Sequence, residues 1–331
     1  MIPYIDMHCD TLYRGVQWGL QDIFEVEGAM LDGKRLVAAK AEAQFFAIFF
    51  PPKTQMDNLT RYLHQQGKTL DDMEYYREAR DLFYRTLERH GEQIAYAGSG
   101  HELDRNRTAG KVSAFLTLED GRAVEGSMER LGLFFADGVR LITLTWNHVN
   151  CFGNPNSRHA EAMGLGLTLF GKEAIGEMNR MGMLIDVSHL SDGGFWDVVK
   201  LTKKPFVASH SNCRALSPHP RNLTDEMIRA LAECGGVAGL NFAADFVEER
   251  EHTGVSTVER LALHAKHLLD VGGEDVVAIG SDFDGVDDRL EIADPTKMYL
   301  LSDALKMQGF TERQIEKVFR ENVRRVIADT I

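Results

Sequence analysis

The sequence predicts an α/β fold: a closed (β/α)8 barrel of the TIM type, with a helical insertion after the second strand and extra helices at the C-terminal end. Eight short apolar runs rich in β-branched or aromatic residues recur along the chain, and a segment with helical periodicity follows each of them. Such alternation is typical of a parallel sheet, and eight units favour a closed barrel over an open sheet. We therefore expect residues 1–331 to form a single barrel domain.

The eight predicted strands are short and continuously apolar, as buried strands are. In chain order they cover residues 4–8, 43–50, 112–118, 139–145, 183–187, 205–209, 236–241 and 276–280.

Two segments between the strands carry clear signals of crossover helices. Residues 168–180 have helical spacing and end before Gly182, and residues 224–233 begin with Thr224 as an N-cap and have acids in the first turn. Both segments therefore fit the helix that joins two parallel strands.

The insertion and the C-terminal helices follow from the same signals. Residues 51–100 are too many for one crossover, and the strongly charged part at 57–89 has helical spacing, so an inserted helical arm is expected about 51–100. After the last strand, Asp294 and Pro295 open a helix that closes near Gly309, and Thr311-x-x-Gln is a capping box that opens a final helix.

The composition and the cysteine spacing disfavour several classes of protein. The 50 acidic and 37 basic residues give a net charge of −13, which disfavours a nucleic acid or an anionic membrane as the partner. The four cysteines are widely spaced without a Cys-x-x-Cys pair, so reduced thiols are expected. The sequence has no signal-peptide pattern and no apolar window of about 18 residues, so we expect a cytoplasmic protein without a membrane anchor.

Polar residues at the C-terminal ends of barrel strands indicate function, because that end holds the active site in such enzymes. His8 and Asp10 end the first strand, and the strand period of two places both side chains on one side. Imidazole nitrogen and carboxylate oxygen suit zinc and related divalent metals. An isolated His-x-Asp pair is nevertheless far more often a polar strand end, so this pair alone predicts little.

Three further strand ends strengthen the metal interpretation. His189 and His210 close strands separated by one β/α unit, which a barrel brings to the same rim. Glu119 follows the third strand, and its two oxygens suit a bridge between cations about 3.5 to 4 Å apart. Asp120 is the alternative to Glu119, but Gly121 makes it more typical of a turn. Together these residues favour a two-metal centre with five ligands. The alternative is that the histidines are structural and that Glu119 is only a charged residue at a helix N-terminus.

From Asp6 to Val326 the sequence resembles the membrane dipeptidase (renal dipeptidase) family of binuclear zinc peptidases. The matching stretches are Asp6–Leu12, Leu118–Gly121, Leu141–Thr145, Asp186–His189, Ser209–Asn212, Arg221–Asn222 and Gly280–Val286. Position by position, the resemblance implies that His8 and Asp10 bind one zinc ion and that His189 and His210 bind the other. It also implies that Glu119 bridges the two ions.

The resemblance assigns roles to residues that bind no metal. Arg221 would hold the terminal carboxylate of the substrate, for which a planar guanidinium is a natural partner, whereas the residues alone suggest a surface arginine. Asp282 would pass a proton to the leaving amine, and Asp284 before a glycine is more typical of a turn. The family has a histidine where this chain has Trp146, so we expect His148 to assist the scissile carbonyl and to contact the substrate.

These observations predict a zinc-dependent dipeptidase, in which a hydroxide that bridges two zinc ions attacks the peptide carbonyl. The resemblance implies that a C-terminal D-residue is an acceptable part of the dipeptide, and that a homodimer is a plausible assembly. One alternative is a metal-dependent hydrolase of N-acyl amino acids or of another amide or lactone. Another is a metal-binding protein without turnover, which the presence of Asp282 beside five ligands disfavours.

Overall fold

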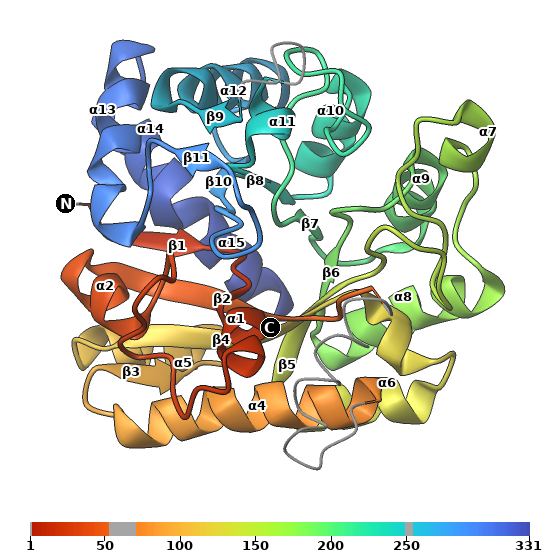
Figure 1. Cartoon of the computed structure of the whole chain (residues 1–331). Coiled ribbons are helices and arrows are strands. Elements are labelled where there is room, and N and C mark those ends of the chain that lie inside the picture. Colours follow the sequence, from red (N-terminus) through yellow and green to blue (C-terminus); the bar gives the residue numbers. More distant parts are fainter. Residues whose placement is uncertain (1, 53–70, 249–253) are drawn as a thin grey trace.

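The computed structural model describes residues 2–52, 71–248 and 254–331, which contain a closed barrel of eight parallel strands (Figure 1). The strand order is β2-β1-β10-β8-β7-β6-β5-β4, and β4 pairs with β2 to close the ring. The predicted fold class is therefore confirmed. The barrel strands are β1 (Tyr4–Asp6), β2 (Ala41–Phe49), β4 (Val112–Glu119), β5 (Val139–Thr143), β6 (Leu184–Asp186), β7 (Val207–Ala208), β8 (Val237–Leu240) and β10 (Val277–Ile279).

Three short strands lie outside the predicted set. β3 (Ile94–Tyr96) pairs with the first residues of β4, and β5 pairs with the later residues of β4. β9 (Val255–Ser256) and β11 (Arg289–Leu290) form a separate parallel pair. Each of these strands has two or three residues and is defined by its pairing with another segment of the chain.

Helices cover the outside of the barrel (Figure 1). They are α1 (Thr11–Gln17), α2 (Gly33–Ala38), α4 (Asp72–Arg89), α5 (Gly100–Thr108), α6 (Met128–Ala136), α7 (Ala160–Met163), α8 (Leu169–Met181), α9 (Asp192–Leu201), α10 (Asp225–Glu233), α11 (Ala244–Val247), α12 (Val258–Gly272), α13 (Tyr299–Met307), α14 (Glu312–Glu316) and α15 (Asn322–Thr330), with short helical turns η1 (Gly121–Val124), η2 (Pro295–Lys297) and η3 (Lys317–Glu321). Within the described residues, no helix is long and apolar enough to span a membrane.

Side-chain caps set the helix boundaries that the sequence predicts. The Thr168 and Thr224 hydroxyls accept hydrogen bonds from the first turns of α8 and α10, and α8 ends at Gly182 with a φ of +78°. Thr311 and Gln314 form a reciprocal capping box at the start of α14. These three predictions are confirmed.

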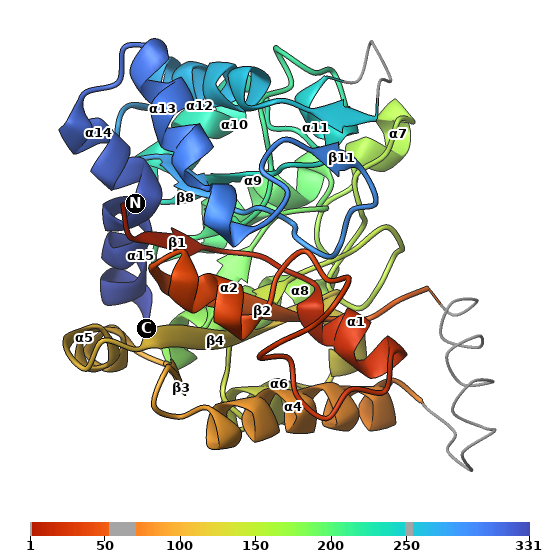
Figure 2. The same ribbon diagram turned by 60° about the vertical axis from the view of Figure 1, so that its left-hand side comes forward.

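The predicted insertion is described only in part, because residues 53–70 lie outside the described residues. Its described helix, α4, begins with a capping box between Asp71 and Glu74. The buried face of α4 includes Tyr75, Tyr76 and Phe83, and the helix packs against α1 and β2 (Figure 2). The aromatic face of α4 therefore belongs to the main core of the protein.

Apolar side chains fill the barrel interior, and α15 closes its N-terminal end. Ile5, Phe45 and Phe115 belong to one buried cluster with Val326 and Ile327 of α15. In Figure 2, α15 and both chain ends lie together on the left-hand side. Because apolar side chains fill that end, we expect the functional side chains at the opposite end, where the strands finish.

Candidate metal centre

The C-terminal ends of five barrel strands bring six of the predicted site residues together. The cluster contains His8 and Asp10 after β1, Glu119 at the end of β4, His189 after β6, His210 after β7 and Asp282 after β10. All six side chains are buried, and none belongs to a residue that is more than 8% exposed. Residues up to 274 positions apart in the chain therefore form one polar cluster inside an apolar barrel.

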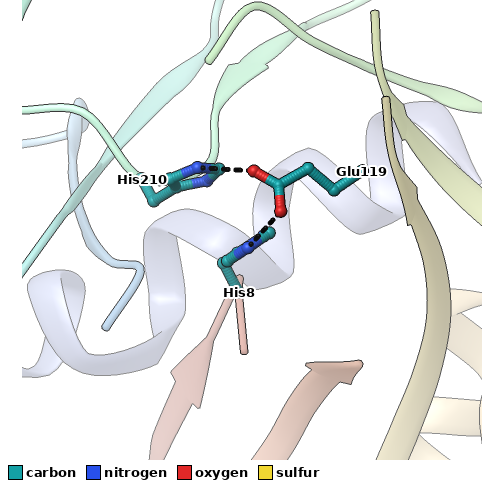
Figure 3. A group of neighbouring side chains, drawn as sticks. All are labelled: His8, Glu119 and His210. Atoms are coloured by element: carbon teal, nitrogen blue, oxygen red, sulfur yellow. Dashed lines mark ion pairs between the residues drawn. The ribbon is translucent and has the colours of Figure 1, made fainter. Parts of the chain in front are cut away.

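Glu119 lies at the centre of the cluster. Its Oε2 is 3.4 Å from His8 Nε2, and its Oε1 is 3.0 Å from His189 Nε2 and 3.4 Å from His210 Nε2. Figure 3 shows the carboxylate between the rings of His8 and His210, with one oxygen directed at each. The two oxygens thus face two different groups of ligands, which is the arrangement required of a bridge.

The first group surrounds His8. Its Nε2 is 3.7 Å from Asp10 Oδ2 and 3.8 Å from Asp282 Oδ1. One ligand atom of each of these three residues lies within 4.8 Å of the others, as in the set of His8, Glu119 and His210. An imidazole with two carboxylates suits zinc and neighbouring divalent metals.

The second group consists of two histidines whose Nε2 atoms point at the same space. His189 Nε2 and His210 Nε2 are 3.2 Å apart, and both approach Glu119 Oε1. The other ring nitrogens are held by protein groups: His189 Nδ1 lies 3.0 Å from Asn147 Oδ1, and His210 Nδ1 lies 2.7 Å from Ser209 Oγ. Histidine ligands of metals are commonly oriented in this way.

Burial and the neighbouring acids shift the pKa values of the cluster residues. Desolvation raises the pKa of Glu119 to about 8 and also raises the pKa of Asp10. Burial lowers the pKa values of His189 and His210 well below the usual range. For His8, burial also acts to lower the pKa, but Glu119 and Asp10 outweigh it and the pKa lies well above its usual value. Bound cations would therefore stabilise the ionised carboxylates of this cluster.

The donor atoms fit a divalent metal pair. His8 Nδ1, His8 Nε2 and Asp10 Oδ1 are buried without a hydrogen-bond partner within the described residues. Unsatisfied buried polar atoms are costly, and in native proteins they require a reason such as a bound ion. The chemistry of the set, three imidazoles and two or three carboxylates, is that of zinc sites.

Two site residues have a left-handed backbone conformation, which is uncommon for residues other than glycine. The φ of His189 is +68° and that of Asp282 is +64°. Such conformations persist only where surrounding contacts enforce them, and they cluster at functional sites.

A cavity of about 380 Å³ opens over the cluster and gives it access to solvent. Asp10, Glu119, His189 and Asp282 lie in its wall, together with the aromatic residues Tyr13, Phe49, Trp146 and Phe246 and the acids Asp245, Asp284, Asp287 and Asp288. This volume suits a small molecule. The cavity therefore places the buried ligands within reach of a substrate.

Sequence reasoning missed part of this wall. Phe49 lies 5.1 Å from Trp146 and 5.5 Å from Tyr13 between ring centroids, so the three rings form one aromatic side of the cavity. Asn147, which contacts His189, was also missed. The available signal was position, since Phe49 ends β2 and the Trp146-Asn147 pair follows β5, at the rim where the metal-binding side chains also lie.

Arg221 lies beside the cluster but does not itself line this cavity within the described residues. It is 5% exposed, and it donates hydrogen bonds to Ser211 Oγ and to the His210 carbonyl, each at 3.1 Å. Its guanidinium lies over the ring of Phe246, a residue of the cavity wall, and its Nε is buried without a hydrogen-bond partner in the described parts of the chain. Burial lowers the pKa of Arg221 to about 10, which leaves it charged at neutral pH.

His148 is not brought to the cluster. Its side chain is exposed beside Trp146, and it is absent from the cavity wall that the described residues form. In this loop, Trp146 and Asn147 are the residues that line the cavity. The predicted catalytic and substrate-binding role of His148 therefore stays a prediction without geometric support.

The other two acids have structural contacts. Asp120 accepts hydrogen bonds from the Arg122 amide and from Asn150 Nδ2, at 3.0 and 2.6 Å. Asp284 accepts from Thr11 Oγ1 and from the amides of residues 30 and 31, and so it joins the loop after β10 to α1 and to the segment before α2. Both observations agree with turn roles for these residues.

The family model described as "Membrane dipeptidase (Peptidase family M19)" matches residues 1–330. Among curated proteins, an uncharacterised dipeptidase of Schizosaccharomyces pombe is 34% identical over 223 residues, which cover 66% of this chain and 53% of the yeast protein. The family match thus spans essentially the whole barrel.

The fold of the whole chain is also found in solved structures, among them two metallopeptidases. A metallopeptidase from Rhodobacter sphaeroides, liganded with a phosphinate mimic of the dipeptide L-Ala-D-Ala, superposes with a TM-score of 0.86 at 28% identity, covering 100% of this chain and 99% of that protein. The dipeptidase AC, a metallopeptidase of family M19, superposes with a TM-score of 0.85 at 28% identity over 99% and 98% of the two chains.

Proposed function

Because the chain belongs to the membrane dipeptidase family, peptidase family M19, and is a metal-dependent dipeptidase, we propose that it holds two zinc ions at the cluster around Glu119 and hydrolyses short dipeptides there. The observation that carries the proposal is the position of Glu119. One of its oxygens faces His8, and the other faces His189 and His210.

The residues present divide into two sets of ligands. His8 and Asp10 would hold one ion, His189 and His210 the other, and Glu119 would bridge them. When bound, the zinc pair supplies Lewis acidity, which activates water near neutral pH and polarises the peptide carbonyl. Zinc is preferred because imidazole and carboxylate ligands suit it, although the same set accepts other divalent metals.

Asp282 is the proposed carrier of the proton. Its Oδ2 accepts a hydrogen bond of 2.9 Å from Asn241 Nδ2, its Oδ1 lies 3.8 Å from His8 Nε2, and the residue lines the cavity. Asn241 is in turn hydrogen-bonded to Asn212 through two contacts, so the residue that holds the Asp282 carboxylate is itself fixed in position. Asp282 would take a proton from the attacking water and deliver it to the leaving nitrogen, as a general acid and base does.

Arg221 is proposed to bind the C-terminal carboxylate of the dipeptide. Its Nε is buried and has no hydrogen-bond partner among the described residues. Burial lowers the pKa of Arg221, whereas the nearby charges of Asp282 and Glu119 act to raise it. A guanidinium fork binds a carboxylate through two charge-assisted hydrogen bonds. A fixed carboxylate near the metals would restrict the enzyme to short peptides.

The proposed substrates include dipeptides with a C-terminal D-residue. Support comes from the Rhodobacter sphaeroides relative, whose crystal structure contains a phosphinate mimic of L-Ala-D-Ala. The cavity volume of about 380 Å³ is compatible with a dipeptide.

A kinetic comparison of four compounds tests this function with zinc present: L-Ala-D-Ala, L-Ala-L-Ala, L-Ala-D-Ala amide and N-acetyl-L-Ala. We expect hydrolysis of the two dipeptides. The amide, which lacks the carboxylate, should have a kcat/KM roughly 10 to 100 times lower than L-Ala-D-Ala, the loss expected for one charge-assisted contact. Equal rates for amide and acid, or preference for the acylated amino acid, would reject the dipeptide assignment.

Two arginine variants sharpen the comparison. Arg221→Lys keeps a positive charge but removes the planar fork, so it should raise KM for the dipeptide and leave the amide almost unaffected. Arg229→Lys on the exposed face of α10 is the matched control, and it should behave as the wild type. If both variants lose the same activity, Arg221 does not bind the carboxylate.

A further inference from the structure

The same buried contact between an aspartate and a serine joins two pairs of neighbouring barrel strands, β6 with β7 and β1 with β10. Both contacts lie next to residues of the metal cluster. In the first, Asp186 at the end of β6 accepts hydrogen bonds through Oδ1 from the Ser188 and Ser209 amides, at 3.0 and 2.8 Å. Its Oδ2 accepts from Ser209 Oγ at 2.5 Å and from Thr143 Oγ1 at 2.6 Å. We call this contact the Asp186 clasp.

The second contact, the Asp6 clasp, repeats this arrangement between β1 and β10. Asp6 Oδ1 accepts from the Ser281 and His8 amides, at 2.8 and 3.3 Å, and Asp6 Oδ2 accepts from Ser281 Oγ at 2.6 Å. Both aspartates and both serines are 0% exposed. In each clasp the serine directly precedes a residue of the cluster, Asp282 in one case and His210 in the other.

The clasps differ in the remaining contacts of their side chains, since only Asp186 also accepts from a threonine hydroxyl, that of Thr143. Ser209 Oγ also lies 2.7 Å from Nδ1 of the His210 ring, whereas the further contacts of Ser281 Oγ are with backbone groups, the Phe283 amide at 3.2 Å and the His8 carbonyl at 3.3 Å. The Nδ1 atom of His8 has no hydrogen-bond partner within the described residues. Only the Asp186 clasp therefore touches an imidazole.

The hydrogen bonds around Ser209 fix the position of a proton. A carboxylate only accepts, so the single proton of the Ser209 hydroxyl points at Asp186 Oδ2. The hydroxyl oxygen must then accept from His210, which places the imidazole proton on Nδ1. The lone pair is left on Nε2, the atom that faces Glu119 Oε1 at 3.4 Å and His189 Nε2 at 3.2 Å.

We propose that Asp186 and Ser209 are positioning residues, which hold His210 in the tautomer that can bind metal. The inference rests on the proposed function in one respect, the assignment of His210 as a metal ligand. Carboxylate groups commonly orient metal-binding histidines directly, and here the aspartate would act through one serine hydroxyl. The Asp6 clasp, which has the same chemistry and burial but no ring contact, provides a natural control.

Asp186→Asn is the decisive variant, because it changes the direction of hydrogen bonding without changing shape. The new amide group donates to Ser209 Oγ, which then has to give its own proton to a neighbour. His210 Nδ1 at 2.7 Å is nearer than Ser188 Oγ at 3.3 Å, so the ring proton moves to Nε2 and blocks the metal-binding atom. Asp6→Asn causes the same reversal at Ser281, where the carbonyl of His8 accepts the proton and no ring changes.

The experiment measures two quantities in the full-length chain: the His210 tautomer by ¹⁵N NMR of metal-free protein, assigned by difference with a His210→Gln variant, and the zinc affinity by competition with a chelator. For Asp186→Asn we expect the Nε2-H tautomer and a zinc affinity about 10 to 100 times weaker than in the wild type. For Asp6→Asn we expect the wild-type tautomer and a loss of affinity smaller than threefold.

The proposal is overturned if Asp186→Asn keeps the Nδ1-H tautomer, or if the two variants lose zinc affinity equally. If Asp186→Asn does not fold, the pair Ser209→Ala and Ser281→Ala makes the same comparison, and equal zinc affinities would again reject the proposal. Neither measurement depends on turnover. A wild type that binds zinc with the expected tautomer but hydrolyses no dipeptide would refute the proposed function alone.

Discussion

Asp282 has the two contacts that a proton-transferring carboxylate needs. One oxygen accepts from Asn241, the other lies 3.8 Å from His8 Nε2, and the residue lines the cavity. Asp282→Asn keeps the shape and the contact with Asn241 but cannot carry the proton. We expect kcat to fall by roughly 10²- to 10⁴-fold, the usual range for a general acid or base, while the zinc content measured by elemental analysis stays at the wild-type level.

The matched control for Asp282 is Asp303→Asn, which removes an acid from the exposed face of α13. This variant should keep the wild-type kcat. If Asp282→Asn retained more than a tenth of the wild-type kcat with full zinc content, the proton-transfer role would be wrong. If it lost zinc as well as activity, Asp282 would act as a ligand instead.

His264 predicts a pH dependence of stability that is independent of the metal cluster. Its Nδ1 accepts from the Cys213 amide at 3.1 Å and its Nε2 donates to the Val247 carbonyl at 2.9 Å, so the neutral ring is fully used. Burial lowers the pKa of His264 to about 4, against about 6.5 in the unfolded chain. Between these values the unfolded state binds more protons, so the free energy of unfolding falls as the pH decreases from 6.5 to 4.

The size of this effect has an upper limit of about 3 kcal/mol, since each unit of pKa shift corresponds to about 1.4 kcal/mol. Urea unfolding at pH 7 and pH 4.5 measures it, with His264→Gln as the comparison, because glutamine can accept and donate at the same two places without titrating. The wild type should lose more stability than His264→Gln over this interval. An equal loss would show that His264 does not titrate as its burial implies.

At the scale of residues, the sequence predicted which side chains gather but not how every one of them is aimed. The grouping of His8, Glu119 and His210 follows from strand ends, because a parallel barrel brings all such ends to one rim. The exposure of His148 depends on the path of the loop after β5, which no periodic pattern encodes. The contact between Ser209 and His210 depends on rotamers and could be read only from the structure.

At the scale of elements, we expect α15 to contribute to the free energy of unfolding but not to catalysis. It closes the N-terminal end of the barrel, where Ile327 is 0% exposed and packs with the interior cluster. Ile327→Ala should lower the free energy of unfolding by about 2 to 5 kcal/mol, the usual result of truncating a buried isoleucine. Because the metal cluster lies at the opposite end of the strands, kcat/KM at 25 °C should stay within twofold of the wild type.

Asp329→Ala is the control in the same helix, since Asp329 is exposed. It should change the free energy of unfolding by less than about 0.5 kcal/mol. Urea titrations of both variants and of the wild type make the comparison. A large loss of kcat/KM in folded Ile327→Ala protein would show that the two ends of the barrel are coupled, contrary to this account.

The elements that the sequence predicted well share a strong local signal. The eight barrel strands are apolar runs, and α8, α10 and α14 begin at threonine caps. β3 has three residues and is defined by its pairing with β4 rather than by its own pattern. Elements that depend on a partner distant in sequence are the ones that local reasoning misses.

At the scale of the whole molecule, the barrel turns weak local motifs into a site. Each strand end contributes one or two polar residues, and closure between β2 and β4 places them around Glu119. The apolar interior and α15 fill the opposite end, and the cavity of about 380 Å³ leads from solvent to the cluster. The central claim is that this cluster acts as a two-metal unit.

A zinc titration of metal-free protein tests that claim most directly. Hydrolysis of L-Ala-D-Ala is measured after each addition, with the bound zinc determined in the same samples. Because Glu119 faces both groups of ligands, we predict that activity rises until two zinc ions are bound per chain and then stays constant. Full activity at one bound zinc ion, or activity that does not depend on zinc, would contradict the account.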